Sequence, residues 1–125
     1  MDLHPMPGRL AIARLDPSAT IPDWAQQIGP LVSITRTEDE LSIVCPEGWI
    51  PDSVQRSTGW FCLKVSGPVG LAAVGILAAL VDPMRDIGIS VFALSTYDTD
   101  CLLLPEVQRD EAISALEAAG HHIER

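Results

Sequence analysis

The sequence predicts an α+β fold whose second half follows the split ferredoxin-like order β-α-β-β-α-β. Three observations support this prediction. Strand-like and helix-like runs follow one another in that order after residue 59. A largely apolar helical run is then followed by two strands around an acidic turn. The third observation is an internal similarity between the two halves, which predicts that a related but shorter unit comes first.

The first half contains the pattern of an abridged unit. Its predicted elements are a strand over 10–15, a short helix over 21–28, a hairpin over 31–37 and 41–45, and a connection over 46–59. The first strand ends at the turn signal Asp16-Pro17. The helix is bounded by Pro22, which suits a first helical turn, and by Gly29, which suits the position after the last one.

The second half has clearer boundaries. Its predicted elements are a strand over 60–65, a tight loop over 66–70, a helix over 71–81, strands over 89–95 and 101–104, an amphipathic helix over 106–119 and a short strand over 121–123. Pro83 has no N–H group and clashes with the preceding turn, so the first helix should kink or stop there. Gly120 suits the position after the second helix.

The two halves resemble each other at a shift of 59 residues. The shift superposes Gly29 on Gly88, Val32 on Val91, Thr37 on Thr96, Asp39 on Asp98, and Pro46-Glu47 on Pro105-Glu106. Both matched segments read as hairpins with acidic turns. We interpret the match as a duplicated β-α-β-β unit with an abridged first copy, and a chance similarity between two hairpins is the alternative.

Composition excludes several classes of function. The 125 residues carry a formal net charge of −9, which suits neither nucleic acid nor an anionic membrane surface. The longest apolar run, residues 71–81, is too short to span a bilayer, and the N-terminus lacks the apolar region of a signal peptide. Cys45, Cys62 and Cys101 follow neither a zinc nor a disulfide pattern, so we expect a soluble cytoplasmic protein without a metal or cofactor.

The loop over residues 66–70 is the first candidate for a binding site. It leads from a strand into a helix, whose first amides have no partners within the helix, and such a helix start binds carboxylate or phosphate groups. A nucleotide-binding P-loop is excluded because Ile76-Leu77 stand where Lys and Ser or Thr would follow Gly75. The alternative is a glycine-rich turn that only permits close packing.

The hairpin turn over residues 95–100 is the second candidate. Its sequence, Ser-Thr-Tyr-Asp-Thr-Asp, supplies two carboxylates, three hydroxyls and a phenol. A carboxylate here and helix amides nearby can together bind the ammonium and carboxylate groups of a free amino acid. The alternative is a polar turn that only faces solvent. A small enzyme that uses Asp98 or Asp100 as a base is a further alternative.

Two other observations bear on partners and chemistry. The helix over 71–81 is apolar on nearly every face, which favours packing against the other half or against a second copy in a homodimer. His4 lies in an N-terminal stretch that we expect to be loose, and His121-His122 would point to opposite faces of a strand. No serine-hydrolase or zinc-protease motif is present, so the sequence shows only weak candidates for a catalytic site.

The residues just described also carry a family resemblance. The run from Gly67-Pro68-Val69 through Gly75-Ile76-Leu77 to Gly88 and the Ser95–Asp100 turn resembles the ACT domain superfamily. It is most similar to the ACT-type domain of small bacterial tandem-ACT proteins, shared with the arginine-sensing CASTOR proteins and related to the regulatory domains of aspartate kinases. The resemblance implies tandem ferredoxin-like ACT units, with antiparallel sheets, helices on one face and an abridged first unit.

The resemblance also implies a domain division and a site. We expect a diverged ACT-like domain over 1–58 and an ACT domain over 59–125. The module would sense a free amino acid at a domain or subunit interface without catalysis, and the alternative is a scaffolding module that binds another protein. The predicted ligand-binding residues come from the loop, the helix start, the following strand and the acidic turn. They are Ser66, Gly67, Pro68, Val69, Gly70, Val74, Gly75, Ile76, Leu77, Ile89, Ser90, Val91, Thr96, Asp98 and Asp100.

Overall fold

The computed structural model describes residues 1–66 and 75–124. By its internal contacts the chain forms two units, each of which is described by itself. The larger unit consists of residues 1–6 and 61–125, and the smaller unit consists of residues 7–60. Strand β5 (Gln55–Val65) begins in the smaller unit and ends in the larger one. Within the described residues, neither helix has the length and apolar character needed to cross a lipid bilayer.

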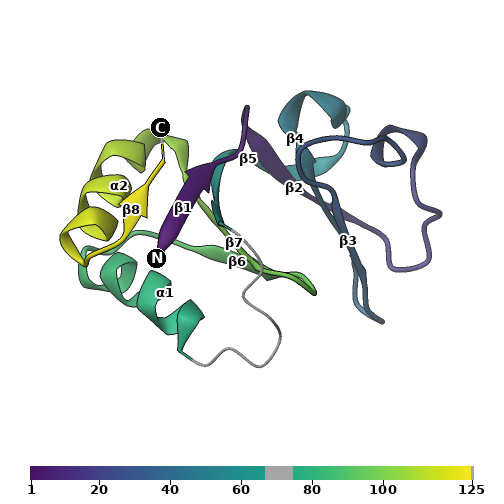
Figure 1. The fold of residues 1–125 in the computed structure, drawn as a ribbon. Helices are drawn as coiled ribbons and strands as arrows, with labels where there is room; N and C mark the ends of the chain where they lie inside the picture. The colour runs from purple at the N-terminus through teal and green to yellow at the C-terminus, as the bar shows by residue number, and fades with distance from the viewer. Residues whose placement is uncertain (67–74, 125) are drawn as a thin grey trace. The chain divides into compact units, whose positions relative to one another are not determined.

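The larger unit is a sheet with two helices against one face (Figure 1). Its strands lie in the order β6-β7-β5-β1-β8. The elements are β1 (Asp2–Pro5), the end of β5, α1 (Ile76–Asp86), β6 (Phe92–Ser95), β7 (Asp100–Pro105), α2 (Arg109–Ala118) and β8 (His122–Ile123). A 3₁₀ turn over Glu106–Gln108 precedes α2. The predicted ferredoxin-like α+β fold is confirmed in this unit.

One apolar core joins the helices of the larger unit to its sheet. Alternate residues of β5 and β7 point toward the helices, as the period of two in a strand requires. The core comprises Leu3, Phe61, Leu63, Val65, Leu80, Met84, Ile89, Leu102, Leu104, Ala112, Ile113, Leu116 and Ile123. The helices therefore owe their positions to the side chains that they bury against these strands.

Helix α1 differs from its prediction at both ends. In the described residues it begins at Ile76, after Gly75 with φ 78°. Of the two outcomes expected at Pro83, a kink or a stop, the stop is wrong, because the helix continues through Pro83 to Asp86. Pro83 cannot donate to the carbonyl of Ala79, and Nε2 of His121 lies 2.9 Å from that oxygen. Burial of residues on either side of Pro83, Leu80 and Met84, holds both turns of the helix against the core.

The N-terminal stretch is a strand, so the expectation of a loose terminus is wrong. Strand β1 pairs antiparallel with β5 and parallel with β8, with Leu3 opposite Val65 and Ile123. Leu3 is fully buried in the core. A single leucine among polar and proline residues shows no periodicity. The strand forms because tertiary partners on both sides satisfy its backbone.

The smaller unit is a four-stranded antiparallel arrangement in the order β3-β4-β2-β5. Its strands are β2 (Leu10–Leu15), β3 (Ser33–Arg36), β4 (Leu41–Pro46) and residues 55–60 of β5. Its core consists of Ala11, Ala13, Ala25, Leu41, Ile43, Cys45 and Ile50. The strand over 10–15 and the hairpin are confirmed. The expected connection over 46–59 contains a 3₁₀ turn over Glu47–Trp49 and gives way to β5 at Gln55.

The predicted helix over 21–28 is wrong. Only a 3₁₀ turn over Asp23–Ala25 forms, and only Ala25 of that turn is buried. Ile28 is fully exposed, so the segment has too few buried apolar residues to hold a helix against the sheet. The first copy of the repeat is therefore abridged by the loss of its helix.

The repeat itself is visible in the element boundaries. Strands β3 and β6, strands β4 and β7, and the 3₁₀ turns after them coincide at the shift of 59 residues. The turns are also equivalent, because Thr37 N donates to Glu40 O at 2.9 Å and Thr96 N donates to Thr99 O at 2.8 Å. The two hairpins thus share register and turn geometry as well as sequence.

Candidate functional site

The site is built at the end of β5, where the chain leaves the sheet toward α1. The turn between β6 and β7 is tied to this point, because Oγ1 of Thr99 donates to Val65 O at 3.0 Å. Thr99 is one of the two polar residues buried among the described residues. The structure therefore brings the start of the predicted loop and the acidic turn to one rim of the larger unit.

Three segments far apart in the sequence meet at Ser66. Its hydroxyl lies 3.0 Å from Nδ1 of His4 and donates to Oε1 of Glu124 at 3.4 Å. Its backbone N–H donates to Asp2 O at 2.9 Å, which continues the pairing of β5 with β1. Sequence reasoning did not include His4 or Glu124 in the site. Both reach Ser66 only because β1 enters the sheet beside β5 and β8, and no local pattern signals that pairing.

The order of these groups decides what chemistry they can perform. In a serine-nucleophile triad the imidazole lies between the hydroxyl and the carboxylate, so that it can remove the hydroxyl proton. Here the Ser66 hydroxyl lies between His4 and Glu124. A hydroxyl group has one proton, and the Ser66 hydroxyl donates it to Glu124. The oxygen of Ser66 therefore accepts a hydrogen bond from Nδ1–H of His4. The order of the three groups therefore differs from that of a serine-nucleophile triad.

The acidic turn is only partly engaged. Oγ of Ser95 donates to Oδ1 of Asp100 at 2.6 Å, and Oγ1 of Thr96 bonds to the backbone of Thr99. Asp98 is exposed and makes no hydrogen bond or ion pair with any residue in 1–66 or 75–124. Thr96 and Asp100 thus stabilise the turn, whereas the carboxylate of Asp98 faces outward.

The other predicted site residues divide into three groups. Ile89 is a core residue of the larger unit, and Val91 packs against that core. Gly75, Leu77 and Ser90 are exposed, whereas Ile76 is half-buried. Gly67, Pro68, Val69, Gly70 and Val74 lie outside the described residues. Ile89 is therefore explained by packing alone.

The three buried cysteines differ in the direction of their pKa shifts. The neighbouring Cys101 thiol and, next to it, burial raise the pKa of the Cys62 thiol, whereas the Cys62 thiol lowers the pKa of Cys101. Burial raises the pKa of Cys45 to about 11. Since the thiolate is the reactive form, the raised pKa values make Cys45 and Cys62 poor nucleophiles in the folded protein. Among the described residues, no three His, Cys, Asp or Glu side chains are grouped to hold a metal ion.

Comparison with known proteins agrees with this geometry. A profile of the ACT domain family matches residues 55–118, and a second profile, described as an N-terminal domain, matches residues 8–53. No match was found among curated protein sequences. A crystal structure of an Agobacterium tumefaciens protein shares 41% identity at a TM-score of 0.92, over 98% of this chain and 91% of that one.

More distant structures share the fold. A Vibrio cholerae protein described as a possible transport protein shares 18% identity at a TM-score of 0.75, over 94% of this chain and 88% of that one. The regulatory subunit of aspartate kinase from Thermus thermophilus shares 11% identity at a TM-score of 0.59, over 90% and 93%. The profile match, the ferredoxin-like larger unit and the β5 rim lead to one conclusion: this chain belongs to the ACT domain family.

Proposed function

We propose that the chain is a non-catalytic regulatory module that binds a free amino acid at the rim formed by Ser66 and the β6–β7 turn. Membership in the ACT family supports a regulatory ligand-binding role. The single observation that carries the proposal is the meeting of His4 and Glu124 at Ser66, next to the turn that Thr99 ties to β5.

The groups at this rim suit the two charged ends of an amino acid. The carboxylate of Glu124 and the outward-facing Asp98 can accept hydrogen bonds from an ammonium group. The Ser66 hydroxyl can turn from Glu124 to a ligand oxygen, because its 3.4 Å bond to Glu124 is long and therefore weak. His4 keeps the hydroxyl oriented in both cases.

We also propose that the module works as a homodimer in the cytoplasm. In the described part of α1, Leu77 is 39% exposed, and Ala78 and Ala79 are exposed as well. Part of the apolar surface that the sequence predicts to be buried is thus exposed on the described part of α1, and a second copy would cover it. The three free, buried cysteines fit a reducing compartment.

Thermal-shift screening of the twenty amino acids tests the ligand proposal. A ligand present at about 100 times its Kd should stabilise the folded state by about 2.7 kcal/mol. Ser66→Ala should abolish most of this stabilisation. Ser53→Ala is the matched control, because Ser53 is an exposed serine of the smaller unit and should leave the shift unchanged. Stabilisation by none of the twenty, or equal shifts in both variants, would contradict the proposal.

A protein-binding scaffold is the second candidate function, and the exposed Leu77 and Ile87 favour it. On this alternative the open apolar surface meets a different protein and no small molecule is needed. Light scattering coupled to gel filtration separates the two. A concentration-independent dimer that amino acids stabilise supports the sensor, whereas a monomer without amino-acid response favours the scaffold.

A further inference from the structure

A shallow hollow of about 230 Å³ lies on the smaller unit, lined by Ile12, Arg14, Gln55, Arg56 and Ser57. All these residues belong to the paired strands β2 and β5. The register places Ile12 opposite Ser57 and Arg14 opposite Gln55. Because side chains alternate along a strand, these four share one face of the sheet.

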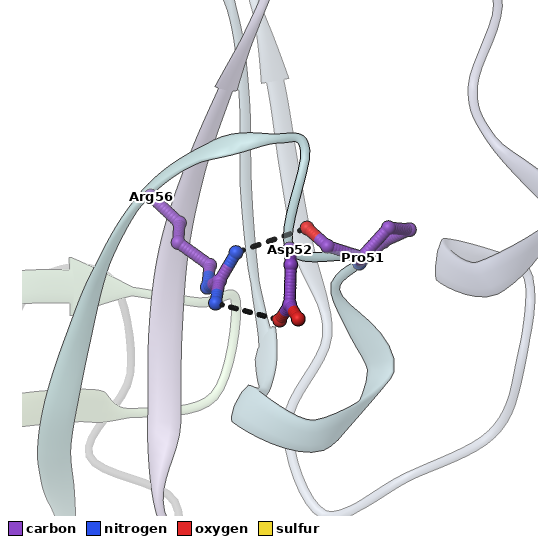
Figure 2. A network of polar contacts seen from close by, with 3 residues as sticks. All are labelled: Pro51, Asp52 and Arg56. Atoms are coloured by element: carbon purple, nitrogen blue, oxygen red, sulfur yellow. Dashed lines mark hydrogen bonds and ion pairs between the residues drawn. The ribbon is translucent and has the colours of Figure 1, made fainter.

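Arg56, the fifth lining residue, alternates with these four along β5, and its guanidinium is engaged by neighbouring groups. Arg56 lies opposite Ala13, a core residue of the smaller unit. Figure 2 shows its guanidinium donating to Pro51 O and to the carboxylate of Asp52, both at 3.0 Å. The charge of Arg56 is therefore already paired, and Arg14 supplies the free positive charge of the hollow.

Arg14 has no carboxylate partner within ion-pair distance in residues 1–66 and 75–124. One of its terminal nitrogens donates to Asp39 O at 3.0 Å, which leaves other N–H groups of the fork unused. The nearby Asp16 is held by Ser18, whose N and Oγ both donate to its carboxylate. These two bonds lower the pKa of Asp16, and the charge of Arg14 makes the smallest contribution to the shift.

Ser57 is oriented to donate as well. Its Oγ accepts a hydrogen bond from the indole Nε1–H of Trp60 at 3.0 Å. With that lone pair occupied, the hydroxyl proton is available to another acceptor. The Gln55 amide on the same face supplies two further donors. Around the apolar floor at Ile12, the hollow thus presents a guanidinium, a hydroxyl and an amide.

We propose that this hollow binds a small oxyanion, a carboxylate or phosphate group, through the Arg14 guanidinium and the Ser57 hydroxyl. Hydrogen-bond donors surround the hollow on one face of the sheet. The Arg14 guanidinium supplies a positive charge without a carboxylate partner among the described residues, in a chain of net charge −9. The volume of the hollow is below the roughly 300–1,000 Å³ of sites for drug-sized ligands, which favours one small anionic group. The site uses only residues of the smaller unit and does not depend on the proposed amino-acid site.

The chain carries its own reporter for this site. It contains three tryptophans, and each gives one indole N–H signal in a ¹⁵N-correlated NMR spectrum. Only Trp60 donates to Ser57, so an anion that draws on the Ser57 hydroxyl should shift the Trp60 signal. Trp24 and Trp49 pack against the core of the smaller unit and report whether the fold is intact. The full-length chain would be titrated with sodium phosphate, sodium succinate and sodium chloride at matched ionic strength.

The proposal predicts a saturable shift of the Trp60 signal with phosphate, succinate or both, and none with chloride. The anion that acts identifies the preferred group. Arg14→Gln should raise the Kd about 10- to 100-fold, the usual effect of losing a charged hydrogen bond. Arg36→Gln removes the same charge at an exposed arginine outside the hollow, and it should change the Kd by less than about twofold because exposed charges are screened. Absence of a saturable shift with both oxyanions, or equal weakening by the two substitutions, would overturn the proposal.

Discussion

The contact between His121 and α1 leads to a quantitative prediction. A carbonyl oxygen only accepts hydrogen bonds, so Nε2 of His121 carries a proton and donates to Ala79 O at 2.9 Å. This donor stands in for the N–H that Pro83, four residues after Ala79, lacks. We expect His121→Ala to destabilise the larger unit, because the residue is only 9% exposed and removal of its ring leaves both a cavity and a lost bond.

The magnitude follows from these two parts. The hydrogen bond contributes about 0.5–1.5 kcal/mol to the free energy of unfolding. Loss of packing around the ring adds a cavity cost, so the total for His121→Ala should be about 2–3 kcal/mol. Pro83→Ala restores a backbone donor for Ala79 O. In that background His121→Ala should cost about 1 kcal/mol less, which is the coupling energy of the double-mutant cycle.

Urea unfolding followed by far-UV circular dichroism is the appropriate assay, because α1 and α2 both belong to the larger unit. Tryptophan fluorescence would instead report the smaller unit, to which all three tryptophans belong. His122→Ala is the matched control, because His122 is the adjacent histidine and is exposed. Additivity of the two substitutions within about 0.3 kcal/mol would show that His121 does not replace the missing donor.

Three further predictions concern stability. Thr99→Val removes the buried bond to Val65 O and should lower the free energy of unfolding by about 0.5–1.5 kcal/mol in a thermal or urea experiment. An unchanged midpoint would argue against a stabilising role for this bond. Gly29→Ala should cost about 1–3 kcal/mol by fluorescence-monitored unfolding, since the new Cβ would lie 2.7 Å from the Trp49 ring; a neutral effect would mean that the ring moves freely. The thiol pKa of Cys45 is raised from 9.0 to about 11, so the folded state keeps a proton that the unfolded state loses, and stability should fall as pH rises across that interval. Cys45→Ala should flatten this alkaline dependence, and an unaltered pH profile would refute the assignment.

The hairpins could be predicted from the sequence because their information is local. β-rich runs around acidic turns identify β3–β4 and β6–β7, and the shift of 59 residues already aligns Thr37 with Thr96. The prediction of a short helix over 21–28 is wrong because it also rests on local signals alone. Its local capping signals are correct, but burial decides whether a helix forms, and Ile28 is fully exposed.

The candidate site shows a similar division. Ser66 and the acidic turn were recognisable by residue type, and the structure brings them together through the bond from Thr99 to Val65 O. His4 and Glu124 were not recognisable, because they approach Ser66 only through the pairing of β1 between β5 and β8. Which strands pair with each other depends on the tertiary context, and a short stretch of sequence does not show that context.

The sequence by itself determined the α+β fold and the repeated hairpins with their acidic turns, because periodicity and turn chemistry act over a few residues. Only the tertiary structure decided that the N-terminal stretch is a strand, that α1 continues past Pro83 beside His121, and that Arg14 and Ser57 share one face. Each of these outcomes depends on satisfying a backbone or side-chain group with a partner distant in the sequence. Such a partner exists only after the chain has folded.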